Sequence, residues 1–162
     1  MSQTKPFKSI SIVSVKLVKE KGVYYGANTI RNPEELASVV KRFLGNTDRE
    51  VFLAINFSTA NTINSIHVVS ISSLDKTIVH PREVFKAAIL SNSSTIALAH
   101  NHPSGSLNPS PEDIQITKKL VQCGEILDIK VIDHIIVADD QHISFAERNQ
   151  KLSFRHFTFA GV

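Results

Sequence analysis

Apolar and polar residues change period along the chain, and these changes divide it into predicted elements. In residues 9–19, Ile, Val and Leu alternate with Ser and Lys, which predicts a strand with a bulge near Val13. Residues 23–25 are predicted to return beside it as a second strand. Apolar residues then recur at helical spacing between 32 and 45, behind a capping Asn32 and a proline, so a helix is predicted there.

From residue 48 onward, strand-like and helix-like patterns alternate. The apolar run at 51–57 and the alternating run at 66–71 predict a hairpin that turns near 61–64. Helices are predicted from His80 to about residue 91 and from Ser110 to Gly124, and strands over 95–99, 131–137 and 143–145. The predicted fold class is therefore α/β, with a mixed β-sheet flanked by helices.

Two histidines one residue apart follow the predicted strand at 95–99. Residues i and i+2 of an extended chain point to the same side, so His100 and His102 direct two imidazoles towards one point. A catalytic zinc site takes three protein ligands, commonly histidine nitrogens and carboxylate oxygens, and a water molecule. One further ligand is therefore needed.

Asp113 is the nearest acidic residue with a suitable geometry. Glycine and proline in the loop at 103–109 can turn the chain back, and Ser110 then lies at a helix N-cap with Asp113 in the first turn. A simple helix cap and two loop histidines would also explain these residues one at a time. Their combination is much less expected by chance, and a chain with one cysteine lacks the thiolates of the usual structural zinc sites.

The sequence here resembles a known family. The pattern H-x-H-x7-S-x-x-D is similar to the metal-binding half of the JAMM motif of MPN-type metallopeptidases. The strings HNHPSG at 100–105, VHPREVFK at 79–86 and DHIIV at 133–137 resemble the RadC branch of that superfamily. The resemblance covers about 48–149.

The resemblance implies a three-layer MPN/JAB (cytidine-deaminase-like) architecture and a single domain over 1–162. It also implies one zinc ion per chain, bound by His100, His102 and Asp113. Full-length RadC relatives usually carry a helical, DNA-binding-like segment ahead of the catalytic domain, and we expect this chain to lack that segment.

A hydrolase of this kind needs a carboxylate outside the ligand set. Zinc lowers the pKa of water from ~16 to about 7, and a nearby carboxylate can take the proton and pass it to the leaving amine. The resemblance places the base at Glu50, just before a core strand. Glu83 and Glu112 are the alternatives, both expected at helix starts, where an acid is favoured anyway. The plain alternative for Glu50 is a solvated charge beside Arg49.

Ser110 has two predicted roles. Its hydroxyl is placed to donate to the oxyanion that forms when water attacks a carbonyl, and one such donor is worth about 2.7–4 kcal/mol of barrier. As a helix N-cap it would contribute about 1 kcal/mol of stability. The two roles can coexist.

The composition of the chain excludes only a few classes of protein. A net charge of +3 and a pI near 9.1 are mildly basic, and no stripe of Lys and Arg with interleaved aromatics supports nucleic-acid binding. The single cysteine excludes an intramolecular disulfide, and no apolar run approaches a membrane span. These features predict a cytoplasmic protein without membrane association. The alternating tail at 151–159 predicts an edge strand or a strand that pairs with a partner chain, as in a homodimer.

The leading function is hydrolysis of an amide or isopeptide bond in an unidentified peptide or protein substrate. The alternative is a DNA-repair-associated accessory protein whose metal site is structural or vestigial, which a salt-dependent DNA-binding assay would reveal. A nucleoside deaminase would need H-x-E and C-x-x-C ligands, which are absent from the sequence. An HNH nuclease and a phosphodiesterase fit the ligand pattern poorly.

The remaining histidines and the cysteine are expected to have simpler, structural roles. His134 follows Asp133 on an apolar strand and is either a buried core histidine or a residue that orients a ligand. His80 is expected at a helix start, and Cys123 is expected to pack without nucleophilic activity. Surface positions are expected for His67, His142 and His156.

Overall fold

The computed structural model describes residues 10–22, 29–72 and 79–148, and in this part of the chain five strands form one mixed sheet. The strand order is β2-β1-β3-β4-β5; β3 and β4 run parallel, and the other neighbouring pairs run antiparallel. The predicted mixed α/β fold is confirmed. The elements are α1 (Pro33–Leu44), β1 (Glu50–Phe57), β2 (Ile63–Ser72), α2 (Pro81–Leu90), β3 (Thr95–Asn101), α3 (Pro111–Leu127), β4 (Lys130–Ala138) and β5 (Gln141–Ser144).

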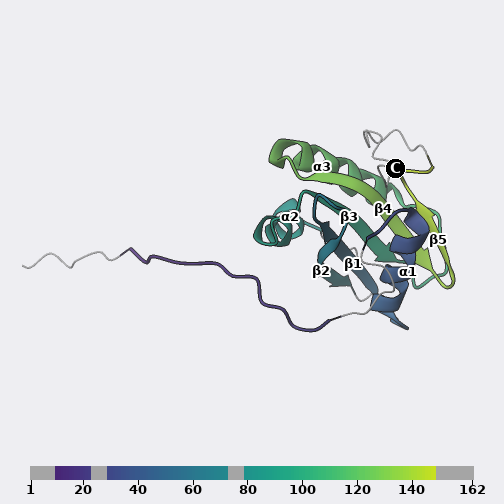
Figure 1. Ribbon diagram of the computed structural model, residues 1–162. Helices are drawn as coiled ribbons and strands as arrows, with labels where there is room; N and C mark the ends of the chain where they lie inside the picture. Colours follow the sequence, from purple (N-terminus) through teal and green to yellow (C-terminus); the bar gives the residue numbers. More distant parts are fainter. Residues whose placement is uncertain (1–9, 23–28, 73–78, 149–162) are drawn as a thin grey trace, which may run out of the picture.

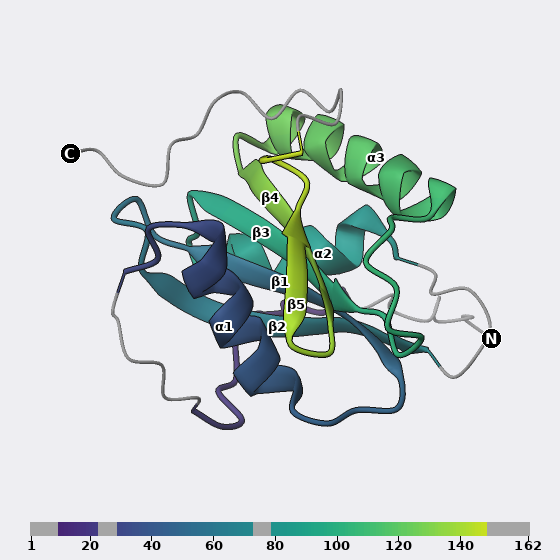
Figure 2. The same ribbon diagram turned by 90° about the vertical axis from the view of Figure 1, so that its right-hand side faces the viewer.

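The helices cover both faces of this sheet (Figures 1 and 2). Successive side chains of β1 point to opposite faces. Leu53 and Ile55 pack in the core that α1 closes, whereas Phe52 and Ala54 pack in the core beneath α2 and α3. The strands are apolar on both faces because both faces are covered. The three layers that the family resemblance implies are therefore present.

Local capping explains where α1 begins and ends. Asn32 Oδ1 accepts a hydrogen bond from Glu35 N at 2.8 Å, and Glu35 Oε2 accepts one from Arg31 N at 2.8 Å. Gly45 follows the helix with φ of 57°, and its N–H donates to the Lys41 carbonyl. This reciprocal cap and glycine stop confirm the predicted helix.

The strand predicted over 9–19 is wrong for the described part of that segment. Residues 10–22 contain no strand, and they extend away from the sheet (Figure 1). Ile10 is 93% exposed and Ile12 fully exposed. Alternation specifies a strand only when a neighbouring strand completes its hydrogen bonds and buries one face, and this segment has no strand partner among the described residues. The predictions for 23–25 and 151–159 lie outside the described residues.

The α3 helix continues past its predicted end at Gly124. It ends at Leu127, and Asp128 takes the left-handed conformation with φ of 55°. Gly124 serves a close approach instead, since a Cβ there would lie 2.5 Å from the Ile129 carbonyl oxygen. Gly124 thus lets the end of α3 pack closely against Ile129, and only two residues separate α3 from β4. Across the described residues, no helix combines the length and apolar character needed to cross a membrane.

Candidate metal centre

Three side chains converge where the carboxyl end of β3 meets the start of α3. His100 lies at the end of β3, His102 follows it, and Asp113 lies in the first turn of α3. One ligand atom from each lies within 4.8 Å of the others. His100 is fully buried, and the other two are partly exposed. The structure therefore brings together the three residues predicted to bind zinc.

The spacing of these atoms suits a tetrahedral ion. His100 Nε2 lies 2.9 Å from His102 Nε2 and 3.4 Å from Asp113 Oδ1, and His102 Nε2 lies 3.6 Å from Asp113 Oδ2. Ligands at about 2.0–2.1 Å from a tetrahedral zinc ion lie roughly 3.3 Å apart. Two imidazoles and a carboxylate are also a known zinc donor set, so the residues fit the ion.

The loop after β3 orients His102. Its Nδ1 donates to the Ser106 carbonyl oxygen at 2.7 Å, which leaves Nε2 with an electron pair towards the centre. The loop turns at Gly105, which has φ of 77° and whose N–H donates to the His102 carbonyl. A side chain at Gly105 would be strained and would approach the Asp139 carboxylate to 3.3 Å.

A capping box holds Asp113. Ser110 N and Ser110 Oγ donate to Asp113 Oδ2 at 2.7 and 2.6 Å, and Asp113 N donates back to Ser110 Oγ at 3.1 Å. Burial alone would raise the pKa of the Asp113 carboxyl, but its interactions with the His100 and His102 imidazoles and the hydrogen bonds from Ser110 outweigh burial and hold that pKa well below its usual range. Asp113 is therefore a carboxylate at neutral pH. The predicted N-cap role of Ser110 is confirmed, and its role towards an oxyanion stays a prediction.

The buried side of the centre contains a second histidine. His134 Nε2 lies 2.8 Å from His100 Nδ1, and His134 Nδ1 lies 2.6 Å from Thr117 Oγ1. Phe52 stacks on His100 with ring centroids 5.8 Å apart. Burial lowers the pKa of His134 well below its ordinary value. His134 is thus both a core residue and a neighbour of a ligand, the two readings that the sequence left open.

Thr117 is a site residue that the sequence reasoning missed. It is fully buried, and its hydroxyl donates to the Asp113 carbonyl oxygen at 2.6 Å. Its position four residues after Asp113 places both on one helix face, which is the signal that could have identified it.

Glu50 lies at the open side of the centre. It begins β1 two residues before Phe52, which pairs with His100 across the sheet, so Glu50 and Phe52 share the face that carries His100. Its charge also contributes to a raised pKa of His102, after the larger effect of the neighbouring Asp113 carboxylate. The structure therefore places Glu50 near the ligands.

Asn101, between the two histidines, fixes the backbone around Glu50. Asn101 Oδ1 accepts from Val51 N at 2.8 Å, and its Nδ2 donates to the Arg49 carbonyl oxygen at 2.9 Å. These bonds hold the residues immediately before and after Glu50. Sequence reasoning assigned no role to Asn101.

The alternative bases have other surroundings. Glu83 bonds Lys86 at 2.5 Å within α2, and this bond lowers the pKa of the Glu83 carboxyl. Glu112 is exposed in the first turn of α3.

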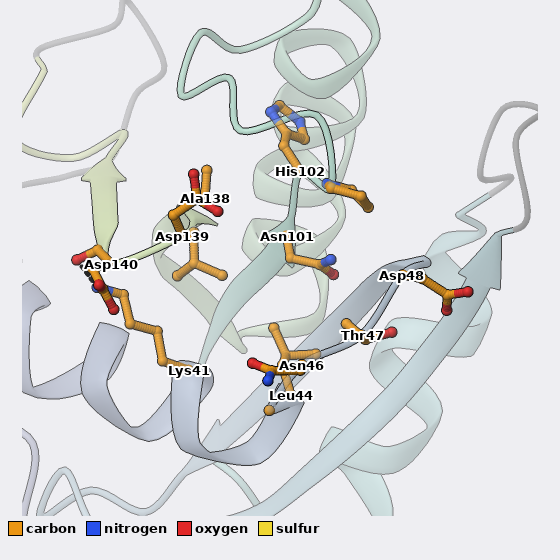
Figure 3. A pocket seen from close by; sticks show the side chains of 13 residues that line it. Lys41, Leu44, Asn46, Thr47, Asp48, Asn101, His102, Ala138, Asp139 and Asp140 are labelled. Atoms are coloured by element: carbon orange, nitrogen blue, oxygen red, sulfur yellow. Dashed lines mark hydrogen bonds between the residues drawn. The ribbon is translucent and has the colours of Figure 1, made fainter.

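A cleft of about 680 Å³ adjoins His102 (Figure 3). One wall is the end of α1 with residues 44–48, and the other is formed by the ends of β3 and β4 and the turn at 139–140. Lys41 bridges the walls by bonding the Asp140 carbonyl oxygen. The volume of the cleft is within the range of small-ligand pockets.

The other singled-out residues lie away from the centre. His80 is the N-cap residue of α2, as predicted, although its side chain makes no capping bond. Cys123 packs against the core beneath α2 and α3. His67 and His142 are partly exposed, in keeping with the surface positions expected for them, and His156 lies outside the described residues.

Comparison with known proteins identifies the family. The model of the RadC-like JAB domain matches residues 30–151. The chain belongs to the RadC-like JAB domain family. This confirms the resemblance found in the motifs.

Several bacterial relatives support the assignment. A UPF0758 protein of Desulfitobacterium hafniense is 45% identical over 119 residues, covering 74% of this chain and 52% of the relative. One from Moorella thermoacetica is 45% identical over 120 residues, with the same two coverages. One from Desulforamulus reducens is 40% identical over 154 residues, covering 91% of this chain and 68% of the relative. The chain thus spans about half the length of the first two, and their names state no activity.

Proposed function

We propose that the protein is a zinc-dependent metallohydrolase that cleaves an amide, peptide or isopeptide bond. The observation that carries this proposal is the convergence of His100, His102 and Asp113 at distances suited to a tetrahedral ion. The chain also belongs to the RadC-like JAB domain family, and its H-x-H-x7-S-x-x-D pattern resembles the metal-binding half of the JAMM motif. An accessible cleft beside His102 gives a substrate room to approach.

The ligand residues would bind one zinc ion per chain. When bound, the ion would supply Lewis acidity that makes water a nucleophile near neutral pH. Asp113 contributes the negative charge of the donor set, because its low pKa keeps it ionised. His102 contributes the electron pair of Nε2 because its Nδ1–H is bonded to Ser106.

Glu50 would move the proton. It is outside the ligand set yet on the strand face that carries His100, so its carboxylate can accept a proton from the attacking water. It would then pass this proton to the leaving amine. The bonds that Asn101 makes to the neighbouring backbone hold Glu50 in place for both transfers.

Ser110 would bind the carbonyl oxygen of the substrate. Its hydroxyl now donates to Asp113 Oδ2, and rotation about Cβ–Oγ would redirect the proton to a developing oxyanion. Asp113 would keep the hydrogen bond from Ser110 N. The cap would therefore survive the change of partner.

The experiment compares zinc-loaded protein with its Glu50→Gln variant on a peptide library and on isopeptide-linked substrates, with new amino termini detected by mass spectrometry. We expect cleavage by the wild type, and at least a hundredfold loss in Glu50→Gln with about one zinc per chain retained. Glu83→Gln is the matched control and should keep both zinc and activity. Unchanged activity in Glu50→Gln would move the base elsewhere, and zinc-loaded wild type that cleaves no substrate would contradict the proposal.

A further inference from the structure

We infer that Thr117 and His134 are positioning residues that fix the tautomer of His100, so that His100 presents an electron pair to the metal before any metal binds. The inference rests on the proposed zinc site, but its evidence is the hydrogen-bond chain on the buried side. That chain joins α3, β4 and β3 through three fully buried side chains. Its direction can be worked out from one end.

The hydrogen-bond chain begins at the Asp113 carbonyl oxygen, a group that can only accept a hydrogen bond. The Asp113 carbonyl oxygen lies 2.6 Å from Thr117 Oγ1, and a hydroxyl carries one proton. That proton must point to the carbonyl, because otherwise two oxygen electron pairs would face each other at 2.6 Å. The oxygen of Thr117 is then an acceptor towards its second neighbour.

The next two links follow from this assignment. His134 Nδ1, at 2.6 Å from Thr117 Oγ1, must carry the hydrogen of that bond. In the neutral ring His134 Nε2 is then an acceptor. His100 Nδ1, at 2.8 Å from it, must therefore donate, which leaves His100 Nε2 without a proton.

The electron pairs of the two imidazoles and the carboxylate therefore point to one place. His100 Nε2 and His102 Nε2 face each other at 2.9 Å as two acceptors, beside the Asp113 carboxylate at 3.4 and 3.6 Å. Such an arrangement would be repulsive in an empty site, so it needs a cation among the three groups: a metal ion or, when the metal is absent, a proton shared by the two imidazoles. Asp113 thus acts twice: its carboxylate is a ligand, and its backbone carbonyl sets the protons that make His100 a ligand.

Histidine partners of this kind usually change metal affinity by ten- to a hundredfold. Here the partner is another imidazole, whose own tautomer must be fixed by a third group. Loss of the Thr117 hydroxyl should free His134 to place its proton on Nε2. His100 would then accept at Nδ1 and carry its proton on Nε2, which faces the metal.

The test measures tautomers and zinc affinity without measuring hydrolysis. Long-range proton–nitrogen NMR of metal-free protein with labelled histidines should show His100 and His134 both protonated at Nδ1. Thr117→Val, which keeps the shape but removes the hydroxyl, should shift both rings towards the Nε2–H tautomer and weaken zinc binding ten- to a hundredfold. Thr117→Ser, which keeps the hydroxyl, should match the wild type.

A second pair of variants addresses His134 directly. His134→Gln has a side-chain oxygen that can accept from His100 Nδ1, so zinc affinity should stay within a few-fold of the wild type. His134→Leu has no acceptor and should lose ten- to a hundredfold. A wild-type His100 protonated at Nε2, or a Thr117→Val protein that binds zinc normally, would overturn the inference. Correct tautomers without any hydrolysis would contradict only the proposed function.

Discussion

The buried and open sides of the metal centre are built in different ways. On the buried side, His100 is held by His134 and Thr117, so three secondary-structure elements must pack before the contacts exist. On the open side, His102 bonds a carbonyl four residues away within its own loop. Tertiary packing thus orients His100, whereas short-range turn chemistry orients His102, the histidine that lines the cleft.

The largest expected effect is loss of the metal. His102→Ala and Asp113→Ala should each lower bound zinc well below one per chain, because two remaining ligands do not hold the ion. Elemental analysis of protein purified with zinc measures this. His142→Ala, on β5, is the control and should retain zinc; full occupancy in either ligand variant would refute the ligand set.

A smaller effect is expected at the start of α3. Ser110→Ala should leave zinc bound and slow hydrolysis by about a hundredfold or more, if its hydroxyl stabilises the oxyanion with ~2.7–4 kcal/mol. It should also lower the free energy of unfolding by about 1 kcal/mol through the lost cap. Ser110→Thr keeps the hydroxyl and should preserve both. Destabilisation with an unchanged turnover rate would leave the serine only its capping role.

Two aspartates with opposite pKa shifts sharpen the comparison through pH. Burial raises the pKa of Asp133 to about 6, although Ser144 and two backbone N–H groups donate to it, whereas the Asp113 pKa is lowered. The folded pKa of Asp133 exceeds the unfolded value of about 3.9. The folded state therefore binds this proton more tightly, and stability from this group is present below about pH 4 and is lost as pH rises through about 6.

Asp133→Asn should remove this pH dependence. Relative to the wild type, the variant should gain about 2–3 kcal/mol in free energy of unfolding between pH 4 and pH 7, since one pKa unit is about 1.4 kcal/mol. Urea denaturation at several pH values measures the difference. A difference that stays constant over this range would show that Asp133 titrates normally.

The smallest effect concerns the backbone around Glu50. Asn101→Ala leaves Val51 N and the Arg49 carbonyl without their side-chain partner, at a cost of about 1–3 kcal/mol of stability. Hydrolysis should fall while zinc stays bound. Asn56→Ala, which loses a bond between β1 and Ser65 on the neighbouring β2, is the matched control. It should reduce stability and leave the rate of hydrolysis unchanged; equal losses of rate in both variants would remove the special role of Asn101.

Sequence patterns were sufficient to predict the elements whose positions depend on residues close together in the chain. Asn32 and Ser110 cap the helices at the predicted positions, and the apolar run of β1 identified a central strand. The failures have physical reasons. Alternation at 10–22 did not produce a strand because no neighbour pairs with it among the described residues, and Gly124 marks a close approach to Ile129 instead of a helix end.

The sequence by itself determined the ligand types, their spacing and the turn that returns Asp113 towards the histidines, because these depend on side chains within fourteen residues of one another. Only the tertiary structure decided which groups meet across the sheet. The contact of His134 with His100 and the hold of Asn101 on the backbone beside Glu50 require pairing of distant strands. Local periodicity contains no information on that pairing, because it describes one strand face and not its neighbour.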